Sequence, residues 1–138
     1  MVKVSVTEAL RNDPTVRHFA IQVARCLSNL QASPLLGARG GFERNHASMS
    51  AGIEKFHVRM PDEEPWKSHL PLSRRTSNNY LVFARHFYND DYYQILAFIT
   101  PDAHQKIDAM LPALIELAEK TFIEISDEEL EELEQFSI

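Results

Sequence analysis

The sequence predicts an α+β domain in which a small antiparallel sheet packs against helices. Two apolar, aromatic and β-branched runs at 80–87 and 92–99 are separated by Asn89-Asp90-Asp91, the pattern of a β-hairpin. Apolar residues recur at helical spacing before and after it. With 138 residues, 44% of them apolar, the chain can bury one core. We therefore expect one domain over residues 1–123, followed by an acidic helix or tail at 124–138.

The first part of the chain predicts a strand, a helix and a loop. Val2, Val4 and Val6 alternate with polar residues, which is typical of a half-buried strand. Asp13-Pro14 supplies an N-cap and a proline at the first helical position, and we expect a helix over residues 14–31. All four glycines lie in 32–52, which predicts a flexible loop. Their spacing matches neither a P-loop nor a dinucleotide-binding fingerprint, which excludes these nucleotide-binding classes.

The second part predicts a further strand, the hairpin and two helical regions. Alternation along the strand at 53–60 places His57 and Arg59 on one face. Thr100-Pro101-Asp102 has the chemistry of a helix start, and Pro112 predicts a break that divides this helix into two segments. Ser126-Asp127-Glu128-Glu129 is a capping box, which predicts a short acidic helix at the end.

Charge is distributed unevenly along the chain. The net charge is −6, but residues 124–138 hold seven acids and no base, so the rest carries 14 bases against 13 acids. Residues 65–89 contain four bases and no acid, and this basic segment suits a polyanionic partner. The single cysteine, Cys26, and the start of the chain, which does not resemble a secretory signal, predict a cytoplasmic protein. We expect no membrane association, because no apolar run approaches the roughly twenty residues that a spanning helix needs.

The motifs narrow the possible chemistry. There is no CxxC, HExxH or Asp-rich cluster, so we expect no metal site and no cofactor, and there is no GxSxG nucleophile motif. Metal-free RNA cleavage stays open, because RNA carries its own nucleophile in the 2′-hydroxyl. Such an enzyme uses arginine at phosphate and histidine for proton transfer near neutral pH. Candidates of both kinds are His57, His69, His86, His104, Arg59, Arg74, Arg75 and Arg85.

Each candidate also has a structural interpretation. His57 could be a half-buried strand residue bonded to a neighbouring strand, and His104 could be a surface residue in a first helical turn. Arg74 and Arg75 could form a solvated loop or a structural clamp. Composition alone therefore leaves a non-catalytic adaptor, with a basic cleft that binds RNA or protein, as the alternative to an enzyme.

Four motifs follow one another between Leu35 and Phe122. They are Arg39 with Phe42, Phe56-His57-Val58-Arg59, Ser73-Arg74-Arg75-Thr76 before Tyr80-Leu81-Val82-Phe83, and Pro101-Asp102-Ala103-His104. The ordered set resembles the YafO family of bacterial type II toxins, which are counted among ribosome-associated mRNA interferases similar in kind to RelE-type toxins. The resemblance implies a RelE-like fold, by analogy, and a toxin that inhibits translation as a metal-independent mRNA endoribonuclease. It also implies mRNA, the ribosome and a cognate antitoxin as partners.

Within this interpretation we expect His57, Arg75 and His104 to converge at one end of the sheet as catalytic residues. Arg75 would stabilise the charge that develops on phosphate, and one histidine would transfer a proton. The residues expected to bind RNA are Arg39, Arg59, Lys67, Arg74, Thr76, Ser77 and Arg85. The acidic segment at 124–138 either folds over the basic cleft, as a mimic of RNA or of an antitoxin, or is a solvated terminal helix.

Overall fold

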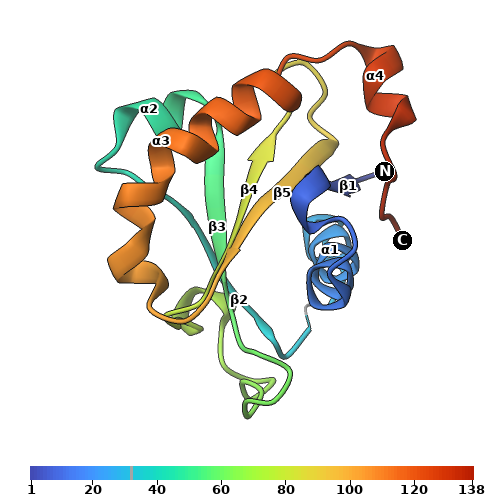
Figure 1. The fold of residues 1–138 in the computed structure, drawn as a ribbon. Coiled ribbons are helices and arrows are strands. Elements are labelled where there is room, and N and C mark those ends of the chain that lie inside the picture. The colour runs from blue at the N-terminus through green and yellow to red at the C-terminus, as the bar shows by residue number, and fades with distance from the viewer. Residues whose placement is uncertain (32) are drawn as a thin grey trace.

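A five-stranded mixed sheet forms the centre of the computed structural model, which describes residues 1–31 and 33–138 (Figure 1). The strands are β1 (Lys3–Val6), β2 (Leu36–Gly41), β3 (Ile53–Val58), β4 (Tyr80–Arg85) and β5 (Tyr92–Ile99). Their order across the sheet is β1-β5-β4-β3-β2. The strands from β2 to β5 pair antiparallel, whereas β1 pairs in parallel with β5 at one edge. The predicted α+β class and the hairpin are confirmed, with a parallel edge strand added.

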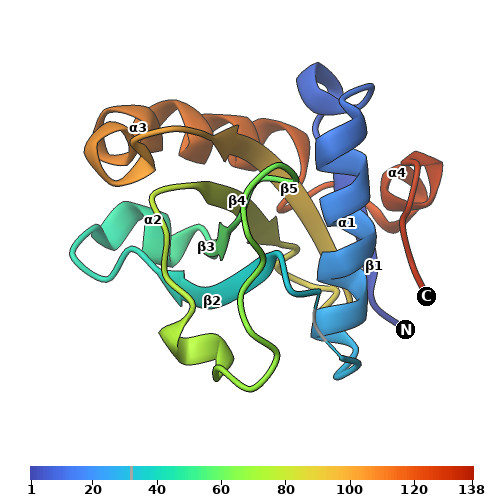
Figure 2. The ribbon, with the colours of Figure 1, turned by 90° about the horizontal axis from the view of Figure 1, so that it is seen from below.

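Helices cover both faces of this sheet. They are α1 (Pro14–Leu27), α2 (His46–Ser50), α3 (Ala103–Thr121) and α4 (Asp127–Glu132), with single 3-10 turns at Glu8–Leu10 and Leu72–Arg74. Figures 1 and 2 show α1 on one face and α3 on the other, with α2 beside α3. No helix in the described part of the chain is both long and apolar enough to cross a bilayer.

The start of α1 follows from its capping residues. The Asp13 carboxylate accepts hydrogen bonds from the backbone N–H groups of Thr15 and Val16, at 2.9 and 3.2 Å, and Pro14 occupies the first turn. The helix ends at Leu27 rather than at the predicted residue 31. Asn29 takes a left-handed conformation with φ of 62°, which turns the chain away from the helix axis.

The predicted loop at 32–52 is wrong, because this stretch contains β2 and α2. Glycine is disfavoured in strands, but β2 gains its hydrogen bonds by pairing with β3. Tertiary context therefore overrides the low strand propensity of its glycines. Gly37 is required by close packing: a Cβ there would lie 2.4 Å from the Arg75 carbonyl oxygen and 2.9 Å from that of His57. α2 begins at a side-chain cap, in which the Asn45 amide oxygen accepts from the Ser48 N–H at 2.8 Å.

The predicted break at Pro112 is also wrong, because α3 runs continuously through it. Pro112 lies on the exposed face of the helix, opposite the buried side chains of Ile107, Leu111 and Leu114. Those side chains belong to the core between α3 and the sheet. Packing on the sheet therefore holds the helix together across the proline, despite the backbone donor that proline lacks.

Strand alternation divides the interior into two cores. The core under α3 contains Tyr80 and Val82 of β4, and the core under α1 contains Leu81 and Phe83 of the same strand. Along β3 the same alternation sends Phe56 and the other even-numbered residues toward α1. Lys55 and His57 therefore lie on the α3 side, near the end of that core.

The C-terminal segment packs against the edge of the sheet. Leu130 of α4 is 1% exposed, and Phe136 forms an antiparallel bridge with Val4 through two backbone hydrogen bonds of 2.7 and 2.8 Å. Arg17 of α1 pairs with Glu134 at 2.5 Å. The segment lies beside β1 and α1, away from α2 and the N-terminal end of α3 (Figure 1). Of the two alternatives for this segment, folding over the basic cleft does not fit its position; apolar contacts fix it at the β1 edge.

Candidate functional site

A solvent-open hollow lies where β4 and α3 begin. Its volume is about 790 Å³, and its walls come from β3, β4, the connection between β2 and α2, and the first turns of α3. Side chains that carry chemistry gather here: Arg44, Lys55, Tyr80, His104 and Asp108 line the hollow. His57 adjoins them, with its ring in edge-to-face contact with Tyr80 at 5.1 Å between centroids.

His57 is held by the backbone of Ser77. The Ser77 N–H lies 2.9 Å from His57 Nδ1 and the Ser77 carbonyl oxygen lies 2.8 Å from it, so either ring tautomer finds a partner. Burial lowers the pKa of His57. The Ser77 hydrogen bond opposes this shift, and the positive charges of Lys55 and His104 add to it. The ring is consequently neutral near pH 7, and Nε2 is the nitrogen left for a ligand.

Lys55 lies two residues before His57 on the same face of β3. Its Nζ is 4.4 Å from the centroid of the Phe42 ring and 5.1 Å from that of Tyr80, so the cation is held between two aromatic faces. Burial lowers the pKa of Lys55, and the carboxylate of Glu43 partly offsets this. The arrangement places a positive charge in the hollow, where it can meet a phosphate.

Tyr80 links the two predicted catalytic histidines. Its ring contacts His57, and its Oη lies 3.3 Å from Nδ1 of His104. Burial raises the pKa of Tyr80, and the carboxylate of Asp108 raises it further. The phenol therefore stays protonated and can donate a hydrogen bond at neutral pH.

Ser77 and Asn78 fix the positions of both histidines. Asp102 precedes α3 in a left-handed conformation and makes no side-chain cap. Asn78 supplies the missing cap from another segment: its side-chain oxygen accepts the His104 N–H at 2.7 Å, and its backbone oxygen accepts the Ala103 N–H at 3.0 Å. Two adjacent residues thus orient His57 on β3 and His104 on α3.

Arg75 does not join this cluster. The residue is 6% exposed, and its guanidinium donates to four backbone carbonyl groups, those of Ser33, Leu36, Ser68 and Leu70, at 2.9–3.4 Å. These contacts fit a structural clamp, the alternative that the sequence left open for Arg75. The structure therefore brings together His57 and His104 of the predicted catalytic set and leaves Arg75 beneath the loop that follows β3.

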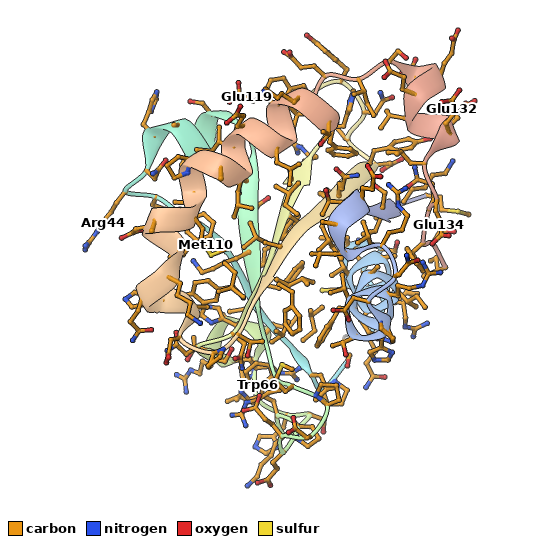
Figure 3. All side chains as sticks on the ribbon, in the orientation of Figure 1. Arg44, Trp66, Met110, Glu119, Glu132 and Glu134 are labelled. Atoms are coloured by element: carbon orange, nitrogen blue, oxygen red, sulfur yellow. The ribbon has the colours of Figure 1, made fainter. Side chains whose placement is uncertain are left out.

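Two of the predicted RNA-binding arginines have partners within the chain. Arg39 forms a bidentate pair with Glu54 at 2.9 Å, on the face of the sheet opposite His57. Arg59 lies over the Trp66 ring at 4.8 Å and donates to the Glu64 carbonyl oxygen. Figure 3 shows Trp66 among the loops at the end of the molecule away from α4.

The remaining predicted RNA-binding residues are spread over the surface. Lys67, Arg74 and Thr76 are exposed on the loop between β3 and β4. The Ser77 hydroxyl donates to the Val58 and Asn79 carbonyl groups, so it shapes the loop. Arg85 is exposed at the far end of β4, roughly 17 Å along the strand from Tyr80 at the usual rise per residue.

Sequence reasoning missed Lys55 as a site residue and gave Arg44 no role. The alternation that assigned a face to His57 also places Lys55 there, so the signal was present. Arg44 follows β2, and the loop predicted for 32–52 gave no reason to place it near β3. Figure 3 shows its side chain extending from the connection before α2. Within residues 1–31 and 33–138, no three His, Cys, Asp or Glu side chains cluster in the manner of a metal site.

Comparison with known protein families relates most of the chain to a toxin family. The family model described as Toxin YafO, type II toxin–antitoxin system, matches residues 25–124. These residues include strands β2 to β5, helix α3 and every member of the cluster around Tyr80. Comparisons with curated proteins and with solved structures gave no match.

Proposed function

The chain belongs to the YafO family of type II toxin–antitoxin toxins, and from this premise we propose that it is a metal-independent mRNA endoribonuclease that acts at the ribosome and inhibits translation. Family membership implies a cognate antitoxin as its partner. The cluster of Lys55, His57, Tyr80 and His104 at an open hollow supports the proposal. Lys55, Tyr80 and His104 line this hollow, and the neutral imidazole of His57 packs edge to face against Tyr80. In this proposal the site of action is the cytoplasm.

His57 is the general base in the proposed reaction. In the tautomer whose Nδ1–H donates to the Ser77 carbonyl group, Nε2 carries a lone pair and takes the proton of the RNA 2′-hydroxyl. The 2′-oxygen then bonds to the adjacent phosphorus. Lys55 and Arg44 stabilise the negative charge on the non-bridging phosphate oxygens.

His104 is the general acid. The bond between phosphorus and the 5′-oxygen breaks, and that oxygen takes the Nε2 proton of the His104 imidazolium. The Nδ1–H of the same ring donates to Tyr80 Oη, which orients it. One fragment then ends in a 2′,3′-cyclic phosphate and the other begins with a 5′-hydroxyl. The phosphate and all protons are accounted for without a metal ion or added water.

Charge stabilisation is assigned to Lys55 and Arg44 in place of Arg75, because the Arg75 guanidinium is occupied by backbone carbonyl groups. The charged loop between β3 and β4, which carries Arg75, has a supporting role. The exposed residues Lys67 and Arg74 contact flanking RNA or ribosomal RNA in this proposal, a task that requires accessible cations.

The test uses purified protein, translating ribosomes and a defined mRNA, with new 5′ ends mapped by primer extension. His57→Gln is expected to reduce cleavage by about 10²- to 10⁴-fold, the usual contribution of a general base. His18→Gln, which changes an exposed histidine on α1, is the matched control and should cleave at the wild-type rate. Ribosome binding by the wild-type protein without any new 5′ ends would favour the non-catalytic adaptor instead.

A further inference from the structure

We propose that the cognate antitoxin docks on a second hollow, between α2, α3 and the segment that follows β4. The docking segment would carry apolar side chains flanked by lysine or arginine. This inference rests on membership of the toxin family, which implies an antitoxin, and is independent of the proposed endoribonuclease activity.

The second hollow has apolar walls and an acidic rim. Its volume is about 300 Å³, and Ala51, Phe87, Ile115 and Ile123 contribute to its walls. This is room for one or two apolar side chains of a partner, and burying them would supply the binding free energy. No segment of the described chain fills it, since α4 and the residues after it pack at the β1 edge.

An exposed aromatic pair stands beside the hollow. Phe87 is 42% exposed and Tyr88 is 77% exposed, and their rings meet edge to face at 6.5 Å between centroids. Their backbone is fixed, because the Phe87 N–H donates to the Ile123 carbonyl group and the Tyr88 N–H donates to Nδ1 of buried His86. Rigid aromatic side chains dominate binding energy at protein interfaces, since they lose little entropy when covered.

The charges at the rim specify the partner. Glu119 and Glu124 are both exposed, and within residues 1–31 and 33–138 neither is within salt-bridge distance of a base. Figure 3 shows Glu119 on α3, on the outer surface of the molecule. Two carboxylates repel the phosphates of RNA and attract lysine or arginine, so the hollow suits a basic protein segment and not a nucleic acid.

Helices α2 and α3 extend from the hollow around Tyr80 to the docking hollow. α2 follows Arg44 of the candidate active site, and α3 runs from His104 at that site to Glu119 at the docking hollow. An antitoxin segment seated on the second hollow would leave the Lys55 cluster uncovered. Docking and cleavage are therefore separable by substitution.

The experiment measures binding of the full toxin chain to its antitoxin, expressed from the reading frame adjacent to the toxin gene, by isothermal titration calorimetry. Tyr88→Ala and the double variant Glu119→Lys with Glu124→Lys should each weaken the complex roughly tenfold or more. The double variant Glu128→Lys with Glu131→Lys makes the same charge change at exposed sites on α4. It is the control and should bind as the wild type does. The His57→Gln variant should also bind normally, whatever its cleavage activity.

Antitoxin affinity within twofold of wild type for both docking variants, with a folded toxin by circular dichroism, would overturn the proposal. If the same variants lost co-sedimentation with ribosomes while keeping antitoxin affinity, the hollow would belong to a ribosomal protein and the proposal would equally fail. Retained cleavage by Tyr88→Ala, together with lost antitoxin binding, is the expected pattern.

Discussion

Replacing Arg75 with alanine distinguishes a structural clamp from a catalytic arginine. The guanidinium is buried and donates to carbonyl groups of Ser33, Leu36, Ser68 and Leu70. These acceptors lie on two segments, one at the start of β2 and one in the loop between β3 and β4. Leaving a buried acceptor without its donor costs about 1–3 kcal/mol, and the bonds to Leu70 and Leu36 are the shorter ones, at 2.9 and 3.2 Å. With partial rescue by entering water, we expect the free energy of unfolding to fall by about 3 kcal/mol.

Thermal unfolding followed by circular dichroism measures this loss directly. For a domain of this size, about 3 kcal/mol corresponds to a decrease in melting temperature of roughly 10 °C. Arg75→Lys should recover only part of the loss, because an ammonium group cannot reproduce the planar fork of donors. Arg74→Ala, at the exposed neighbouring position, is the control and should melt within about 2 °C of wild type. An Arg75→Ala variant that melts like wild type but does not cleave RNA would refute the clamp and restore Arg75 as a catalytic residue.

Three further predictions test the site and the packing around it. Cleavage should rise with pH through the pKa of His57, which lies below the ordinary value of about 6.5. Lys55→Gln should raise the pKa of His57 in an NMR titration, because a nearby cation is lost. An unchanged titration would contradict the electrostatic effect of Lys55 on His57. Gly37→Ala should lower the free energy of unfolding by about 2–3 kcal/mol in urea, since its Cβ would meet the backbone, whereas Gly40→Ala, with nothing within 4 Å, should be within about 0.5 kcal/mol of wild type. Leu130→Ala should cost about 3 kcal/mol in the same assay if α4 belongs to the folded unit, and a change below about 0.5 kcal/mol would mean that the C-terminal segment is dispensable for folding.

The sign of the His57 effect on stability follows from the same shift. Because burial lowers the pKa of His57 in the folded protein, the unfolded chain binds this proton more readily. The stability contributed by the neutral ring is present above about pH 6.5 and is lost as the pH falls from that value through the folded pKa. His57→Gln should therefore flatten the pH dependence of the melting temperature on the acidic side.

Local patterns predicted the elements whose side chains repeat at a clear period. Strand alternation identified β3 and the hairpin, and Asp13-Pro14 identified the start of α1, because in each case the signal lies within a few adjacent residues. β2 escaped prediction, since its glycines gain strand structure only by pairing with β3. The break predicted at Pro112 was wrong for a related reason, because packing of α3 on the sheet outweighs a local helix breaker.

The candidate site was predictable in part. His57 and His104 lie in sequence motifs that pointed to them, and the fold brings both against Tyr80. The role of Arg75 was not accessible from sequence, because its four acceptors are backbone oxygens, which leave no trace in residue identity. The docking hollow was equally hidden, since α2 and α3 are about sixty residues apart and only the folded sheet brings them together.

The most direct test of the central claim replaces the 2′-hydroxyl at a mapped cleavage position in the mRNA by hydrogen. The proposed chemistry uses that hydroxyl as the nucleophile, with His57 as its base, so the single 2′-deoxy substitution should abolish cleavage at that bond while neighbouring sites are still cut. Cleavage of the unmodified mRNA should leave a 2′,3′-cyclic phosphate and a 5′-hydroxyl. Undiminished cleavage of the 2′-deoxy mRNA, with a 5′-phosphate on the downstream fragment, would mean that water attacks the phosphate and would contradict the proposed mechanism.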